Sequence, residues 1–315
     1  MCVASFLCPW PLSVPSPPVV MPSPASVLRS LLARWRSYKY RFVPWVALNL
    51  SRSRRNMRYV ADSHSDKVIP DAKVYSTLVG LFQALFRADL HRQRDLLDLL
   101  PEATKSIYGL TGTGNQERSS YCDLTPQADD ILLRSLGFSI DRRQSSLDGA
   151  GTGVFVSKGF VPKGAVVSMY PGAIYQTYEP ILIQSIGNPF IFRCLDGILI
   201  DGNDKKISKS VYRSCSRRDQ LGPLKMCDST WLTSSPRNPL AVGQYVNNCS
   251  NECAANVCYQ EYDIPDTFPV ELRQYIPNVR YSQDMEGPLR CVVLVAFRDI
   301  HCGEELFSNY FTLVQ

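Results

Sequence analysis

Three short segments in the C-terminal half of the chain carry residue types that can hold a ligand. The first is Gly149-Ala-Gly151-Thr152-Gly153, whose closely spaced glycines let the backbone approach a charged group. A tight turn is the alternative interpretation of such a run. It is not a dinucleotide-binding fingerprint, because the residues after it predict a strand and not a helix.

The second segment, residues 243–251, is polar and rich in asparagine. Clustered asparagines commonly form turns, but adjacent Asn247 and Asn248 can also satisfy the donor and acceptor edges of a purine. The third segment runs from Gly303 through two glutamates to Tyr310. A tyrosine there can be a packing residue, or its phenol can line an apolar channel and form a hydrogen bond at its tip.

In order and spacing, these segments resemble the SET domain of protein lysine methyltransferases. The matching stretches are Gly151-Thr152-Gly153, Tyr170-Pro-Gly172, Asn247-Asn-Cys-Ser250 and Gly303–Tyr310, within residues 138–311. The resemblance implies a mainly β SET fold, with short curved sheets, a knot-like C-terminal threading and an α-helical N-terminal region. It also implies S-adenosylmethionine as cofactor and a lysine-bearing protein as substrate.

The resemblance also assigns roles to individual residues. Gly151, Thr152 and Gly153 would hold the methionine end of the cofactor. Asn247 and Asn248 would contact its amino group and adenine. Tyr310 would border the cofactor and act as the catalytic residue, with its hydroxyl in the channel where lysine meets the methyl group. Sequence-distant motifs would converge because the segment that bears Tyr310 threads near the asparagine segment.

Several positions depart from the family pattern. Asn248 stands where the family has histidine, Cys249-Ser250 inverts its Ser-Cys, and Asn309 replaces the aspartate before the final tyrosine. The zinc cluster that often follows this tyrosine has no counterpart, so we expect residues 175–242 or the helical region to supply a wall of the substrate channel. These departures leave a catalytically silent SET-fold interaction module as the alternative to an active methyltransferase.

Charge is distributed unevenly along the chain. Residues 1–61 contain no Asp or Glu but nine of the 34 basic residues, which leaves 25 basic against 29 acidic residues in 62–315, a net of −4. An acidic body argues against direct nucleic-acid binding, although the basic segment keeps a nucleic-acid-binding protein as a third interpretation. Its Arg-rich amphipathic stretch over residues 26–61 fits either a mitochondrial transit peptide or a basic docking tail.

The eleven cysteines form no Cys-x-x-Cys pair, so we predict no metal site and a reducing, intracellular compartment, mitochondrial or nuclear/cytosolic. Apolar runs are too short for a membrane span. We predict three regions: a basic and disordered or targeting segment 1–61, a helical region 62–137 and the SET domain 138–311.

Periodicity predicts the elements within these regions. Asp71 should cap a long helix, Pro101 should open a short helix that stops at Gly109, and Thr125-Pro126 should open another that ends at Gly137. After Phe138, short β-branched and aromatic runs predict short strands with long connections.

Overall fold

The computed structural model describes residues 38–40, 57–60, 67–90, 93–109, 127–250, 252–283 and 287–314. The chain divides into two compact units, Met1–Ser37 and Tyr38–Gln315, and all of these residues belong to the second. Apart from 38–40 and 57–60, the Arg-rich amphipathic stretch predicted over residues 26–61 lies outside the described residues, as does the segment 110–126.

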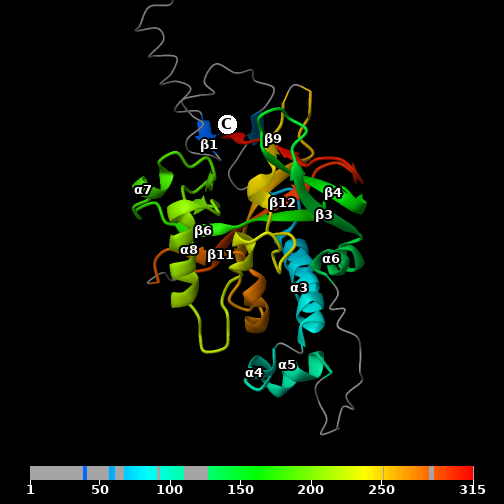
Figure 1. Ribbon diagram of the computed structural model, residues 1–315, viewed down its shortest axis with the longest axis vertical. Helices are drawn as coiled ribbons and strands as arrows, with labels where there is room; N and C mark the ends of the chain where they lie inside the picture. Colours follow the sequence, from blue (N-terminus) through cyan, green and yellow to red (C-terminus); the bar gives the residue numbers. More distant parts are fainter. Residues whose placement is uncertain are drawn as a thin grey trace, which may run out of the picture. The chain divides into compact units, whose positions relative to one another are not determined.

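A long helix, α3 (Asp71–Ala88), dominates the region before the strands (Figure 1). Its buried residues recur at helical spacing, as the sequence predicts. They are Val74, Leu78, Leu81, Phe82, Leu85 and Phe86. The predicted cap at Asp71 is wrong: Pro70 holds the cap position, and Asp71 lies in the first turn, where its charge favours the positive end of the helix dipole.

Three shorter helices follow α3 in the described part of this region. They are α4 (Arg94–Leu97), α5 (Glu102–Ile107) and α6 (Ala128–Leu136). Pro101 precedes α5 and Gly109 follows it, as predicted. Gly137 ends α6 with a left-handed φ of 83°, also as predicted, whereas the predicted start at Thr125-Pro126 lies outside the described residues.

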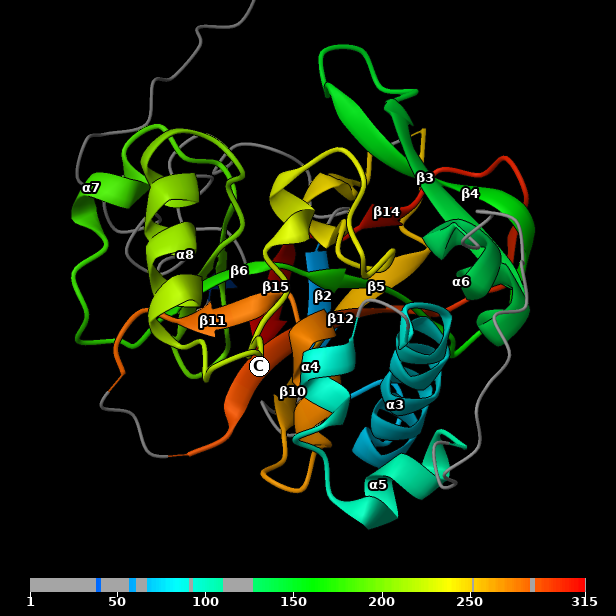
Figure 2. The ribbon, with the colours of Figure 1, turned by 60° about the horizontal axis from the view of Figure 1, so that its bottom comes forward.

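From Phe138 onward, short strands form several small sheets, which confirms the predicted mainly β architecture (Figures 1 and 2). The strand orders are β13-β4-β3, β11-β6-β8-β7, β5-β12-β10-β14-β9 and β1-β15-β2. The strands of the first two sheets are β3 (Phe138–Gln144), β4 (Thr152–Val161), β6 (Gly172–Tyr175), β7 (Ile191–Arg193), β8 (Leu199–Asp201), β11 (Asn278–Arg280) and β13 (Ile300–His301). Those of the other two are β1 (Tyr38–Tyr40), β2 (Met57–Val60), β5 (Val166–Tyr170), β9 (Asn247–Asn248), β10 (Val257–Ile264), β12 (Leu289–Ala296), β14 (Phe307–Ser308) and β15 (Phe311–Val314).

Helical turns interrupt the strands. Two α-helices, α7 (Leu182–Ser185) and α8 (Lys206–Arg218), lie within residues 175–242. The 3-10 helices are η4 (Thr230–Leu232), η5 (Gly243–Tyr245) and η6 (Val270–Tyr275). No helix among the described residues is long and apolar enough to cross a membrane.

The C-terminal threading has a simple topological basis. Strand β14 lies between β9 and β10 and is parallel to both. Strands β9 and β10 are consecutive in the chain and are joined by residues 249–256. Because β14 lies between them, this connection must cross β14. The arrangement confirms the knot-like threading that the sequence predicts.

The end of the chain pairs with segments that precede the helical region. Strand β15 is antiparallel to β1 and parallel to β2. Both partners lie within residues 1–61, which the sequence analysis places outside the SET domain. The boundary at residue 61 stays a prediction, but backbone pairing crosses it.

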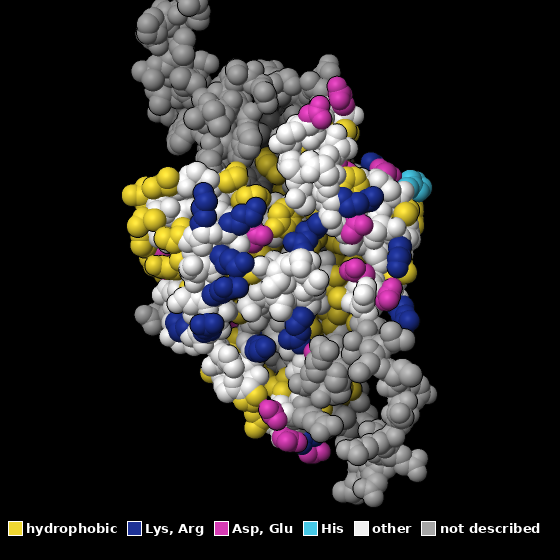
Figure 3. Space-filling model, in the orientation of Figure 1, with side chains coloured by type: hydrophobic (Ala, Val, Ile, Leu, Met, Phe, Trp, Pro, Cys, Tyr) yellow, Lys and Arg dark blue, Asp and Glu magenta, His cyan; other side chains and the backbone are white. Residues whose placement is uncertain are grey.

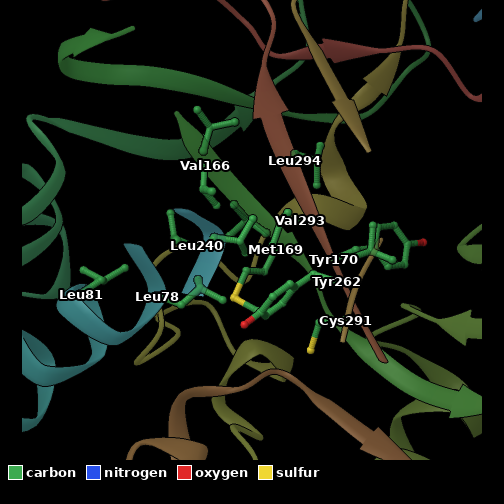
Figure 4. Close-up of a cluster of buried hydrophobic side chains, with 14 of the residues drawn as sticks. Leu78, Leu81, Val166, Met169, Tyr170, Leu240, Tyr262, Cys291, Val293 and Leu294 are labelled. Atoms are coloured by element: carbon green, nitrogen blue, oxygen red, sulfur yellow. The ribbon is translucent and has the colours of Figure 1, made fainter. Parts of the chain in front are cut away.

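One apolar core links the helices to the central sheet. In Figure 4, Leu78 and Leu81 of α3 face Val166, Met169, Leu240 and Val293, and all six are at most 2% exposed. Burial of such side chains is the main stabilising term in folding, at about 25 cal/mol per Å² of apolar surface. The core therefore holds the central sheet, and with it β14, in place against α3.

Candidate functional site

The C-terminal segment joins the glycine strand to the asparagine segment. On one side, the Leu306 amide donates to the Val154 carbonyl at 2.7 Å, and the Val156 amide donates to the Glu304 carbonyl at 3.0 Å. On the other side, Phe307 and Ser308 pair with Asn247 and Asn248. All three sequence motifs therefore meet around residues 304–308.

Glu305 fills the centre of this junction, and the sequence analysis did not identify it as a site residue. Its carboxylate accepts hydrogen bonds from the Ser145 hydroxyl (2.7 Å), the Ser146 amide (2.8 Å) and the Ser146 hydroxyl (2.6 Å). It is only 6% exposed. The doubled glutamate after Gly303 was the available signal, but spacing alone does not tell which carboxylate faces inward.

Gly153 lies in close approach to that carboxylate. A Cβ built at Gly153 would lie 2.1 Å from Glu305 Oε1, far inside van der Waals contact. Gly151 differs, because its φ of 75° favours glycine and a Cβ there would meet no atom within 4 Å. Gly153 therefore makes room for Glu305, whereas Gly151 leaves open space beside the backbone.

Asn247 bridges the glycine strand and Glu305. Its Nδ2 donates to the Thr152 carbonyl at 3.1 Å and to Glu305 Oε1 at 3.2 Å. Gly151, Thr152, Gly153 and Asn247, which the sequence predicts as cofactor-binding residues, therefore form one contiguous group.

Asn248 forms a hydrogen bond with the backbone of Tyr310, the predicted catalytic residue. Its Oδ1 accepts a hydrogen bond from the Tyr310 amide at 3.0 Å. The Asn248 side chain, which stands where the family has a histidine, thus helps to fix the last segment of the chain. Strand β9 is the last strand of its sheet. A ligand that contacts Asn248 would therefore approach the outer edge of β9.

The Tyr310 hydroxyl is oriented by a backbone group. It donates to the Val246 carbonyl at 2.9 Å. Burial raises the pKa of Tyr310 well above that of a free phenol, so the hydroxyl keeps its proton at neutral pH. A neutral, oriented phenol can accept a hydrogen bond from an amine but cannot serve as a phenolate base.

Two buried tyrosines, Tyr170 and Tyr259, belong to the core against which Tyr310 packs. Tyr170 and Tyr259 approach each other edge-on with centroids 6.3 Å apart, and the Ser308 hydroxyl donates to the Tyr259 hydroxyl at 3.0 Å. Burial raises the pKa of Tyr170, and nearby Tyr259 and Tyr310 raise it further. Tyr170 belongs to the predicted Tyr-Pro-Gly step, whereas Tyr259 had no recognisable signal because it lies in an ordinary strand pattern.

Two residues that depart from the family pattern, Cys249 and Asn309, contact each other. The Cys249 thiol donates to Asn309 Oδ1 at 2.8 Å, and the Cys249 amide donates to the Ser308 carbonyl at 2.9 Å. The inverted Cys-Ser order and the asparagine before Tyr310 are therefore structurally matched. They fasten the asparagine segment to the residues that precede Tyr310.

A cleft of about 750 Å³ lies where both regions expected to wall the substrate channel meet. Leu85 and Asp129 of the helical region line it together with Ser234–Arg237 of the 175–242 segment. Arg142 also lines this cleft, and its guanidinium carbon lies 5.3 Å from the centre of the Tyr245 ring in the segment 243–251.

Within the described part of the chain, Cys194, Asp196 and Glu261 offer possible metal-ligating atoms within 4.8 Å of one another. The Arg290 guanidinium already binds the carboxylates of Asp196 and Glu261, at 2.9 Å and 2.8 Å. The positive charge in this group is thus supplied by an arginine, and the cluster is an ion-pair network.

Comparison with known proteins places these motifs in context. No protein-family model matches the chain. A humanized mutant of the Chaetomium thermophilum Polycomb Repressive Complex 2 bound to GSK126 shares 17% identity over 57% of this chain and 16% of that chain, with a TM-score of 0.30. KRYPTONITE in complex with mCHH DNA, H3(1-15) peptide and SAH shares 18% identity over 56% of this chain and 24% of that chain, with a TM-score of 0.29.

The curated relatives are far more similar. SET domain-containing protein 9 of Homo sapiens is 61% identical over 302 residues, which span 92% of this chain and 99% of the human protein. The Pongo abelii protein of the same name is 61% identical over 269 residues, or 82% of this chain and 97% of that protein. The resemblance carried by the four motifs is confirmed, and the chain belongs to the SET domain-containing protein 9 family.

Proposed function

We propose that the chain is an S-adenosylmethionine-dependent protein methyltransferase that transfers methyl groups to a lysine side chain of a protein substrate. The observation that carries the proposal is the convergence of Gly151–Gly153, Asn247 and Tyr310 around the buried threading of residues 304–308. The Tyr310 hydroxyl is oriented toward the Val246 carbonyl, directly before the asparagine pair.

The surroundings fit the cofactor. Gly151 leaves open space beside its backbone, and Gln244, only 4% exposed, has both side-chain amide atoms without a hydrogen-bond partner among the described residues. Gln244 lies in η5, three residues before Asn247. Gly151–Gly153 would hold the methionine end of the cofactor, and Asn247 and Asn248 its amino group and adenine.

When bound, S-adenosylmethionine supplies a methyl group on a sulfonium, which is reactive enough for direct displacement by an amine. The protein has to align a neutral lysine amine with that methyl group and to exclude water. Tyr310 contributes alignment, because its protonated hydroxyl is fixed by the Val246 carbonyl and can accept a hydrogen bond from the amine. The positive charge of the bound cofactor and an apolar channel would both disfavour the ammonium form of lysine.

The experiment that tests this proposal has two stages. Binding of S-adenosylmethionine to the full chain is measured by calorimetry, and transfer of labelled methyl groups is then measured on peptide arrays. Binding with transfer to lysine peptides supports the proposal. Binding without transfer to any array peptide or protein extract would favour the silent SET-fold interaction module.

A further inference from the structure

An unusual group of exposed aliphatic side chains lies on and beside α7. Leu182, Ile183 and Ile186 are 74%, 65% and 75% exposed, and Tyr178 and Ile207 are 74% and 44% exposed. We call these five residues the α7 patch. Soluble proteins seldom expose a contiguous cluster of large aliphatic residues, and such clusters mark contact sites.

The two helices that carry most of the patch are held together. Asn188, which follows α7, donates from Nδ2 to the Gln184 carbonyl at 2.9 Å and to Asp201 Oδ1 at 2.8 Å. The same Nδ2 lies 3.4 Å from the hydroxyl of Ser208, the neighbour of Ile207 on α8. These bonds fix α7 against the start of α8, and Figures 1 and 2 both show α7 on the side of α8 away from β6.

Basic side chains border the patch. Lys205 and Lys206 directly precede Ile207, Arg213 lies further along α8, and all three are exposed. Figure 3 shows the hydrophobic surface at α7 next to Lys and Arg side chains over α8. Two acids lie nearby: Glu179 accepts a hydrogen bond from the Gln176 amide and Asp204 one from the Tyr245 hydroxyl, at 2.6 Å each. Lys205, Lys206 and Arg213 outnumber them by one charge.

We propose that the α7 patch docks on a membrane surface that carries anionic phospholipids. Aliphatic side chains would enter the acyl boundary, while Lys205, Lys206 and Arg213 would reach the headgroup phosphates. Tyrosine is itself favoured at this depth of a bilayer. None of these residues is one of the predicted cofactor-binding or catalytic residues, although all of them belong to the 175–242 segment from which a wall of the substrate channel is expected.

The composition of the patch favours a lipid over a protein partner. Protein interfaces are enriched in Trp, Tyr and Arg and depleted in Lys, and leucine is under-represented among their energetic hot spots. The patch contains one tyrosine and one flanking arginine, but its other four members are one leucine and three isoleucines, and its other two flanking cations are lysines. This balance fits interfacial membrane binding.

Flotation of the full chain with vesicles tests the proposal. Vesicles of phosphatidylcholine alone are compared with vesicles that also contain phosphatidylserine. The basic residues of 1–61 add an attraction that is common to all variants, so the readout is the difference between matched variants. Leu182→Ser/Ile183→Ser should weaken binding to the anionic vesicles about tenfold or more. Leu99→Ser/Ile107→Ser, which removes side chains that are 59% and 56% exposed elsewhere on the chain, should leave it unchanged.

A charge pair and an insertion probe complete the test. Lys205→Glu/Lys206→Glu should weaken binding only where phosphatidylserine is present, whereas Lys158→Glu/Lys163→Glu should not change the difference between the two vesicle types. Ile183→Trp should be quenched by lipids brominated in the acyl chain more than Ile107→Trp. Thermal unfolding confirms that each variant is folded.

Two results would overturn the proposal. Equal binding of the Leu182→Ser/Ile183→Ser and Leu99→Ser/Ile107→Ser variants would remove the patch from vesicle binding, and equal quenching of the two tryptophan variants would exclude insertion. Loss of binding to soluble polyglutamate in the patch variant, with unchanged vesicle binding, would assign the surface to an acidic protein partner instead.

Discussion

At the scale of single residues, the hydroxyl of Tyr310 is the group on which the proposed chemistry depends. It is held by the Val246 carbonyl, and its ring packs against the main core. Tyr310→Phe keeps the ring and removes only the oriented oxygen. Stability and cofactor affinity should change little, while turnover should fall about ten- to a thousandfold, or about 1.4–4 kcal/mol of barrier. A phenylalanine variant with the wild-type rate in single-turnover methyl transfer would contradict this role.

Gly153 and Glu305 make a second prediction at this scale. Gly153→Ala places a Cβ against the Glu305 carboxylate, which is held by Ser145, Ser146 and Asn247. We expect the free energy of unfolding to fall by about 1–3 kcal/mol. In a Glu305→Ala background the same substitution should cost much less, because the obstructing atoms are gone. A double-mutant cycle from urea unfolding measures the coupling, and purely additive costs would contradict the contact.

Sequence reasoning located the residues with distinctive spacing and missed those without it. Gly153, Asn247 and Tyr310 stand in short motifs, and the structure brings them together. Glu305 and Tyr259 had no such signal, because a buried carboxylate looks like any other in a Gly-Glu-Glu turn and Tyr259 looks like any strand residue. Their partners are up to 160 residues away in the chain, as between Ser145 and Glu305.

At the scale of elements, the threading of β14 depends on one asparagine. Asn256, 1% exposed, donates from Nδ2 to the Glu305 carbonyl and accepts at Oδ1 from the Phe307 amide, both at 2.8 Å. Asn256→Ala leaves both backbone groups buried without a partner and should cost about 2–4 kcal/mol of stability. The control Asn203→Ala removes one exposed contact to the Lys205 amide and should cost less. Equal costs in chemical denaturation would show that Asn256 does not hold the thread.

The loop before η4 gives a prediction on pH. Burial raises the pKa of Asp228, while hydrogen bonds from Thr230 and Asn238 oppose the shift. The folded state therefore holds a proton more tightly than the unfolded state, so this group stabilises the fold at acidic pH and its contribution falls as pH rises through the raised pKa. Asp228→Asn should flatten the decline of melting temperature above about pH 4. If the melting temperatures of the wild-type and Asp228→Asn proteins changed with pH in parallel, this role of Asp228 would be contradicted.

Helices and strands were predicted correctly where the local sequence alone determines them. The apolar stripe of α3 and the glycine end of α6 follow from residue type alone. The cap of α3 was misplaced by one residue, because Asp71 serves the helix dipole from within the first turn and Pro70 supplies the extended entry. Strand pairing such as β14 with β9 could not be read from local pattern, since it joins residues about sixty positions apart.

At the scale of the whole molecule, the chain end that bears Tyr310 depends on segments before the helical region. Strand β15 begins directly after Tyr310 and pairs with β1 and β2. A 62–315 fragment lacks both partners, whereas a 38–315 fragment keeps them. The shorter fragment should unfold at a lower temperature, and labelled transfer should show a lower turnover. Identical melting and turnover would return β1 and β2 to the status of a separate tail, as the sequence analysis predicted.

The role of the remaining basic segment stays a prediction. Its charge was visible in the sequence, but two strands within 1–61 were not, because neither Tyr38–Tyr40 nor Met57–Val60 carries enough pattern to predict a strand. A fluorescent fusion of residues 21–61 that enters mitochondria would support a transit role. Nuclear or diffuse signal would leave a docking role.

The central claim is that the threaded motifs form a site for S-adenosylmethionine, and calorimetric titration of the full chain tests it most directly. The account predicts saturable binding at one site per chain. Affinity should fall by about tenfold or more in Asn247→Ala, which loses the bridge to Thr152 and a predicted cofactor contact, and stay unchanged in Asn203→Ala. Absence of binding by the folded wild-type chain, or equal affinity in Asn247→Ala, would contradict the account.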